Sequence, residues 1–269
     1  MTISDHVFAD AIEALDAGDT IRLDLLITQH PRLVRDRLPN GETGYFADPF
    51  LLWFVAGNPI RTERLAPNIV DVARLIIDHA RQLSIHSQQL QMDYTVELTA
   101  TGRVPRESGV QIELIDALVD SGARPAGLDA ALAHGEIAAA KRLLELGADL
   151  SLAAAACLSR WDDARRLAAN ASKTDFADAL VTAAYLGNAE AVAFLLANGA
   201  DPNLRSASIH RHSSALHQAA LVGSAEAVRL LVDAGASLTD RDAIHDGTPA
   251  GWAEHGGREE VARFLRAAR

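Results

Sequence analysis

Three stretches of the chain align without gaps: LDAALAHGEIAAAKRLLELGAD at Leu128–Asp149, LVTAAYLGNAEAVAFLLANGAD at Leu180–Asp201 and LHQAALVGSAEAVRLLVDAGAS at Leu216–Ser237. In each stretch the leading leucine stands seven residues before one glycine, and that glycine stands twelve residues before a second. Two spacings that recur together three times indicate an internal repeat. Internal repeats of this kind are typical of solenoid proteins.

Each repeat reads as a pair of short helices. Leu180 and Ala183 stand three residues apart, which places them on one apolar stripe of a first helix. The first glycine ends that helix where the backbone needs a left-handed turn. A second helix follows, with its stripe at Val228, Leu231 and Val232 in the last stretch. One helical hairpin cannot bury both of its faces alone, so the repeats must stack into an all-α solenoid.

The motifs at the repeat boundaries resemble those of ankyrin repeats. The family's T-P-L-H-x-A-A pattern is similar to SALHQAA at 214–220 and to TPAGWA at 248–253, and its G-A-D-x-N ending is similar to GADPN at 199–203. The resemblance is strong from Leu128 to the end of the chain. It implies an ankyrin-repeat solenoid of stacked helix-turn-helix units that acts as a protein-protein interaction module through a rigid concave groove.

The same spacing extends weakly over the rest of the chain. We expect about eight repeats in a single solenoid over 1–269, with clearer repeats at 128–269 and degenerate ones at 1–127 and in the centre, at 152–171. Two of the degenerate repeats carry extra residues, at 58–67 and 103–110. Both insertions fall between the first and second helix of adjacent repeats, so they should lie side by side. They form either a solvated pair of loops or a second binding surface.

The connections between repeats differ in length along the chain. Ankyrin repeats are joined by β-hairpin-like loops, and the connections at 30–50, 79–95, 199–216 and 235–250 are long enough to hold one. The three central connections, at 122–128, 147–152 and 171–180, are too short. We therefore expect loops at both ends with a notch between them. The notch is either a by-product of trimmed loops or a space that admits a ligand.

Two positions on each first helix should face the concave side, because they lie about one turn apart beside the buried stripe. The predicted floor of the concave groove consists of small apolar side chains in the centre of the chain and of aromatic side chains towards the C-terminus. Tyrosine and tryptophan are common at binding hot spots. The predicted partner-binding residues are Tyr185, Leu221, Trp252, His255, Arg211, His212, Leu52 and Glu97. The alternative is that Tyr185 and Trp252 only pack against the neighbouring repeat.

The histidines leave a second functional hypothesis open. His217 takes the place of the family's motif histidine, which the resemblance implies to be structural. The H-x-H-x4-H spacing of His210, His212 and His217 is a weak zinc signal without a cysteine or carboxylate, so no metal site is predicted. The rival to an interaction module is a small-molecule site or an acid–base enzyme of hydrolase or lyase type. Its candidate residues are His212, His217, Glu254 and His255, and a deep pocket joining two of them would favour it.

Composition narrows the function further. The net charge is −11, which argues against nucleic acid and anionic membranes as partners. Cys157 is the one cysteine, so an internal disulfide is impossible and a reducing, cytoplasmic location is expected. The longest apolar run, near 49–57, is far shorter than the ~20 residues that span a bilayer, and the N-terminus lacks the basic start of a signal peptide. No phosphate-binding or hydrolase motif is present. The sequence therefore favours a protein that binds another protein, without catalysis and without a cofactor. We expect it to be a monomer rather than a homodimer.

Overall fold

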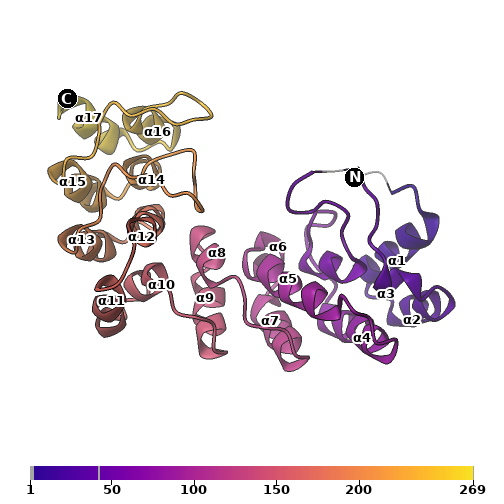
Figure 1. Cartoon of the computed structure of the whole chain (residues 1–269). Helices are drawn as coiled ribbons and strands as arrows, with labels where there is room; N and C mark the ends of the chain where they lie inside the picture. The colour runs from indigo at the N-terminus through magenta and orange to yellow at the C-terminus, as the bar shows by residue number, and fades with distance from the viewer. Residues whose placement is uncertain (1–2, 42, 269) are drawn as a thin grey trace. The chain divides into compact units, whose positions relative to one another are not determined.

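The computed structural model describes residues 3–41 and 43–268, and these residues form helices and loops without a β-strand (Figure 1). Contacts divide the chain into two compact bodies. The N-terminal body holds the chain up to residue 131 together with 136–148, and the C-terminal body holds 132–135 and the chain from 149 onward. The all-helical class is therefore confirmed. The single solenoid over 1–269 and the number of about eight repeats remain predictions.

The N-terminal body is built from two rows of packed helices. In chain order it contains α1 (His6–Ala17), α2 (Thr20–Gln29), α3 (Arg32–Arg35), the 3-10 helix η1 (Leu51–Ala56), α4 (Ile69–Gln82), α5 (Gln88–Ala100), α6 (Arg103–Glu107), α7 (Gln111–Asp120) and α9 (Ile137–Glu145). The first helices α1, η1 and α5 pack on one another, and the second helices α2, α4, α7 and α9 form the other row. Helix α8 (Leu128–Ala133) ends with two residues that belong to the C-terminal body.

The C-terminal body has the same two-row construction, with its helices labelled from α10 to α17 in Figure 1. The inner row is α10 (Leu152–Cys157), α12 (Lys173–Tyr185), α14 (Ala215–Val222) and α16 (Pro249–His255). The outer row is α11 (Trp161–Ala168), α13 (Ala189–Ala197), α15 (Ala225–Asp233) and α17 (Glu259–Ala267). Alanines such as Ala183, Ala219 and Ala253 are fully buried between these helices. Their small side chains let neighbouring helices approach closely.

The turn between the two helices of a repeat needs a left-handed residue, as the glycine spacing predicts. Gly223 ends α14 with φ 87°, and its N–H bonds the carbonyl of Ala219. In the degenerate repeat at 152–171 this glycine is missing, yet Ser159 adopts φ 58° at the corresponding place. The repeat geometry is thus kept where the motif is lost, at a cost of roughly 1 kcal/mol for a side chain in this region.

Two inner helices begin earlier than the repeat spacing predicts. Helix α5 begins at Gln88 instead of Thr95, and α12 begins at Lys173 instead of Leu180. At α12 the reason is local, because Ser172 and Asp175 form a capping box that starts the helix one residue after Ser172. The expectation of a full loop at 79–95 is wrong, since α4 and α5 leave only residues 83–87 between them.

The two insertions lie against each other within the N-terminal body. The backbone N–H of Leu65 donates to Ser108 Oγ at 3.0 Å, which joins 58–67 to 103–110 as expected. The second insertion is not a plain loop, because residues Arg103–Glu107 form helix α6. Arg61 of the first insertion is held by Asp16 of α1 at 2.6 Å, with both side chains largely buried.

Candidate functional site

Two long loops of the C-terminal body are joined by polar side chains. The Arg205 guanidinium bonds both carboxylate oxygens of Asp240, at 2.9 and 3.0 Å. Asn203 bridges to the second loop with both ends of its amide, donating to the Gly235 carbonyl at 3.0 Å and accepting from the Ser237 N–H at 2.8 Å. The loops at 201–214 and 235–248 therefore support each other.

The first of these loops is also bonded to the inner helices. Ser206 Oγ donates to Asp178 of α12 at 2.5 Å. His210 Nε2 lies 3.1 Å from the carbonyl oxygen of Ala133, which can only accept, so this nitrogen donates. The Ala243 N–H donates to the carbonyl of His212 at 2.8 Å. These contacts fix the two loop histidines over the inner row.

Asp242 organises the second loop and one aromatic ring. Its carboxylate accepts from the backbone N–H groups of Ile244, His245 and Gly247 at 2.7–2.9 Å, and from the indole N–H of Trp252 at 3.0 Å. Burial opposes ionisation of this group, but these donors outweigh it and hold the pKa of Asp242 well below its usual range. A charged, buried carboxylate thus holds Trp252 in one orientation before any partner arrives.

His217 is fully buried beside Trp252, with its ring centroid 5.2 Å from the indole. Its Nε2 donates to the Gly247 carbonyl at 3.0 Å, so Nδ1 is the acceptor and receives Ser214 Oγ at 2.7 Å. Both ring nitrogens are occupied by the protein itself. The structure therefore agrees with the structural role that the motif implies for this histidine.

The burial of His217 should make stability depend on pH. Burial lowers the pKa of this imidazole from its ordinary value of 6.5, so the unfolded chain binds its proton more readily than the folded one. As the pH falls through about 6.5, we expect the free energy of unfolding to decrease, with a smaller decrease for His217→Gln. Urea unfolding of both proteins at pH 7.5 and 5.5 tests this. An equal decrease in the two proteins would contradict it.

A series of rings crosses the inner row of the C-terminal body. Tyr185 lies 4.7 Å from His210, His210 lies 6.4 Å from His212, and His212 lies 5.6 Å from Trp252, measured between ring centroids. The ring planes of the Tyr185–His210 and His212–Trp252 pairs are tilted by 35° and 33°. Residues from α12, the first loop and α16 thus form one aromatic surface. The distances between its ring centroids lie in the range at which aromatic pairs attract each other.

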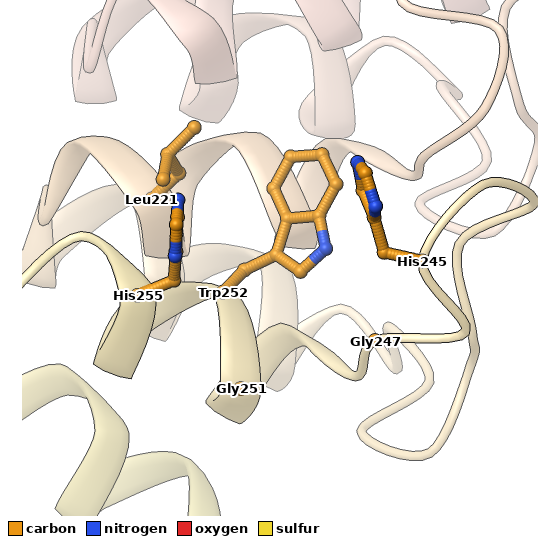
Figure 2. A pocket seen from close by; sticks show the side chains of 6 residues that line it. All are labelled: Leu221, His245, Gly247, Gly251, Trp252 and His255. Atoms are coloured by element: carbon orange, nitrogen blue, oxygen red, sulfur yellow. The ribbon is translucent and has the colours of Figure 1, made fainter.

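A pocket of about 500 Å³ opens beside Trp252. We call it the Trp252 pocket, and its lining residues are Leu221, His245, Gly247, Gly251, Trp252 and His255. Figure 2 shows the indole ring between the imidazoles of His245 and His255. Gly247 is needed here, because a Cβ on it would lie 3.0 Å from the indole ring. Most of the lining is apolar, which suits an apolar side chain better than a charged one.

The C-terminal residues proposed from sequence fall into three places. Tyr185, His212 and Trp252 belong to the ring series, and all three are half-buried. Leu221 and His255 line the Trp252 pocket. Arg211 is exposed in the turn between His210 and His212. These six residues therefore occur on one connected set of elements, namely α12, α14, α16 and the loop at 201–214.

The two N-terminal candidates lie in the other body and differ from each other. Leu52 is only 2% exposed, so its selection as a partner-binding residue is wrong. The reason is that its helix η1 is a 3-10 helix whose six residues are all buried, so no face of it remains open. Glu97 is half-buried on α5, where its side chain lies against Gly127.

The four residues predicted for the alternative ligand site do not lie together in one cluster. His217 is closed off by its own hydrogen bonds, and Glu254 is paired with Arg266 of α17. Only His255 lines the Trp252 pocket. Within residues 3–41 and 43–268 no hydrogen bond joins any two of the four, and no group of three or more His, Cys, Asp and Glu side chains is placed to hold a metal.

Sequence reasoning did not select three residues that shape this site. Asp242 positions the indole, His210 links Tyr185 to His212, and His245 lines the Trp252 pocket. The available signal for Asp242 was the D-A-I-H-D-G run that begins with it, since an aspartate at the start of a turn often accepts backbone N–H groups. His210 and His245 carry no such signal, because their positions depend on how the loops fold back.

The C-terminal part of the chain matches a known protein family. Residues 180–268 match the family described as ankyrin repeats (3 copies). Residues 180–268 contain ankyrin repeats. The matched region includes α14 to α17, both long loops and the whole Trp252 pocket, and ankyrin repeats are generally protein-interaction modules. No curated protein matches the chain. None of the helices in the described part of the chain is long and apolar enough to cross a membrane.

Proposed function

We propose that this chain binds another protein through the ring series and the Trp252 pocket of its ankyrin repeats, without a catalytic step of its own. The observation that supports this most is a half-buried indole fixed by Asp242 at the wall of an open, mostly apolar pocket. A tryptophan in such a pocket is typical of an interface hot spot, because a partner side chain can bury apolar area against it.

The site is organised in advance, and this favours binding. Asp242 holds the indole, and the bonds of Arg205, Asn203 and Ser206 hold the loops that carry the histidines. A partner therefore meets side chains that have already lost much of their rotational freedom. Ordering each such side chain on binding costs about 0.5–1.5 kcal/mol, and the preformed site avoids part of that cost.

The proposal includes a monomer in the cytoplasm as the working form. Its supports are the acidic net charge of −11, which makes copies of the chain repel one another, and the single cysteine, Cys157, which allows no internal disulfide. Nucleic acid and membranes are not among the proposed partners, because the charge balance disfavours both.

Removal of two rings should abolish partner capture. A Tyr185→Ala, Trp252→Ala double variant loses both ends of the ring series, and we expect it to retain at least tenfold less partner than the wild type, since hot-spot truncations cost about 2 kcal/mol or more. The measurement is affinity capture from lysate of the source cell, with bound proteins quantified by mass spectrometry.

The matched control is Trp161→Ala, which removes a half-buried tryptophan from the outer helix α11. All variants are first compared by circular dichroism to confirm their helical content. A partner lost by the double variant and kept by the control supports the proposal. Equal retention by wild type and double variant, or loss by the control as well, contradicts it.

A further inference from the structure

The indole of Trp252 forms a flat wall of the Trp252 pocket, and its orientation is fixed. Its N–H is bonded to the buried carboxylate of Asp242 at 3.0 Å. The His217 ring packs against it at 5.2 Å with its plane turned by 72°, and the His212 ring lies 5.6 Å away. Trp252 is half-buried and lines the pocket, so part of its ring stays open to an incoming group.

Two further rings stand on either side of this indole. Figure 2 shows the indole face-on and the imidazoles of His245 and His255 edge-on, so the planes of both histidines cross the indole plane steeply. A flat ring placed against the indole would therefore stack on it and meet the two imidazoles edge to face. Offset stacks and edge-to-face contacts are the arrangements that aromatic pairs prefer, at centroid separations of about 4.5–7 Å.

The rest of the lining leaves room for such a ring. Leu221 supplies an aliphatic contact, while Gly247 and Gly251 add no side chain. The volume of about 500 Å³ lies within the range of about 300–1,000 Å³ that is usual for ligand pockets, so a side chain with one or two rings fits together with adjoining backbone. An aliphatic side chain fits as well, but only an aromatic one gains from the three surrounding rings.

The charged groups around the pocket offset one another. Three carboxylates are paired with arginines, namely Asp240 with Arg205, Asp246 with Arg241 and Glu254 with Arg266. The charge of Asp242 is enclosed by four N–H donors. The tip of the first loop and the start of α17 carry two positive and two negative exposed groups, which are Arg211, Arg258, Glu259 and Glu260. A charged side chain in the pocket would lose water without gaining an opposite charge, so the charge balance favours an uncharged one.

We infer that the Trp252 pocket is specific for an uncharged aromatic side chain of the protein partner, which stacks on the indole between His245 and His255. The inference rests on the proposed function and adds the class of residue that the partner inserts. Trp252 provides the stacking surface, and the two imidazoles set the orientation of the inserted ring. Ring–ring contacts add affinity beyond what the buried area gives, so an aromatic residue is preferred to an aliphatic one of the same shape.

The test uses small probes that carry only the side chain and a capped backbone. N-acetyl-phenylalaninamide and N-acetyl-cyclohexylalaninamide have nearly the same shape and no charge, and only the first has an aromatic ring. Each is titrated into the full nitrogen-15-labelled chain while NMR follows the indole N–H signal of Trp252, which is assigned with Trp252→Leu. The other two tryptophans, Trp53 and Trp161, serve as internal controls.

We expect the phenylalanine probe to shift the Trp252 signal and to bind about two- to tenfold more tightly than the cyclohexyl probe, as one ring pair would give. The corresponding probes of lysine and glutamate should bind more weakly than that of phenylalanine, because the pocket offers them no unpaired opposite charge.

A second variant, Gly251→Leu, should fill the pocket and keep the indole. A Cβ on Gly251 would meet only Thr248 Oγ1 at 3.6 Å, which is an ordinary contact, and leucine is a better helix former than glycine, so the variant should fold. We expect the phenylalanine probe to bind it at least about fivefold more weakly. The matched control is Trp161→Leu on the outer helix α11, which should leave the binding of this probe unchanged.

Three results would overturn the inference: equal or tighter binding of the cyclohexyl probe or of a charged one, unchanged binding to Gly251→Leu, or no shift of the Trp252 signal up to the solubility limit of the phenylalanine probe. The proposed function is decided separately, by partner capture with the Tyr185→Ala, Trp252→Ala variant. A failed probe experiment together with lost capture therefore rejects the aromatic specificity alone, whereas unchanged capture rejects both proposals.

Discussion

Asp242→Ala is expected to lower the free energy of unfolding by about 3 kcal/mol or more and to release Trp252 from its fixed orientation. The substitution removes the acceptor of three backbone N–H groups of the loop and of the indole N–H of α16, and all four hydrogen bonds are partly buried. Each buried donor left without a partner costs roughly 1–3 kcal/mol, and partial rehydration of the loop lessens the sum. Partner capture should fall together with stability.

The control is Asp246→Ala, which changes the same residue type four positions away. Asp246 is exposed and pairs with Arg241, so its loss should cost less than about 1 kcal/mol. Thermal unfolding followed by circular dichroism should show a midpoint about 6–12 °C lower for Asp242→Ala and a nearly unchanged one for Asp246→Ala. Similar midpoints for the two variants would refute the role assigned to Asp242.

Phe54→Ala is expected to destabilise the N-terminal body by about 3–5 kcal/mol. Phe54 is fully buried, lies edge-on to Phe46 at 5.4 Å, and supports the Arg61 guanidinium 4.8 Å above its ring. Truncation removes the ring from both contacts and leaves a cavity that the 3-10 helix η1 cannot close. Urea unfolding of the variant should therefore show a much lower midpoint than the wild type.

The matched substitution is Tyr45→Ala, whose ring lies 6.4 Å from the same Phe46, measured between ring centroids. Tyr45 is 67% exposed, and the hydrogen bond that it accepts from Tyr94 goes to its backbone carbonyl, which alanine keeps. We expect its cost to be below about 1 kcal/mol. If both variants lose the same stability, the Phe54 ring would not be part of the core of this body.

The sequence predicted the fold where the repeat motif is intact. The spacing of Gly223 and Gly235 located the turns that end α14 and α15, and the histidine of the motif was correctly read as structural. The prediction failed where a helix begins without a motif. The capping box at Ser172 extends α12 into a connection that the repeat spacing treats as a short loop, and spacing alone carries no information on such a cap.

The candidate site was predicted less completely. Tyr185, Leu221 and Trp252 follow from the periodicity of the inner helices, because periodicity decides which face of a helix a residue occupies. The same argument selected Leu52, which is buried because η1 does not have the α-helical period. Asp242, His210 and His245 are brought to the site by loops that fold back over the inner row, and contacts of this kind have no sequence period.

The packing of each body has a consequence for how the chain folds. The main helix–helix contacts join elements that are at most three positions apart in chain order, so little sequence separates contacting residues. A low contact order favours fast folding that starts locally and spreads to neighbouring pairs. Stability in such an array is close to a sum of local terms. Trp53, Trp161 and Trp252 occupy three different helix pairs, so each indole reports the melting of its own neighbourhood.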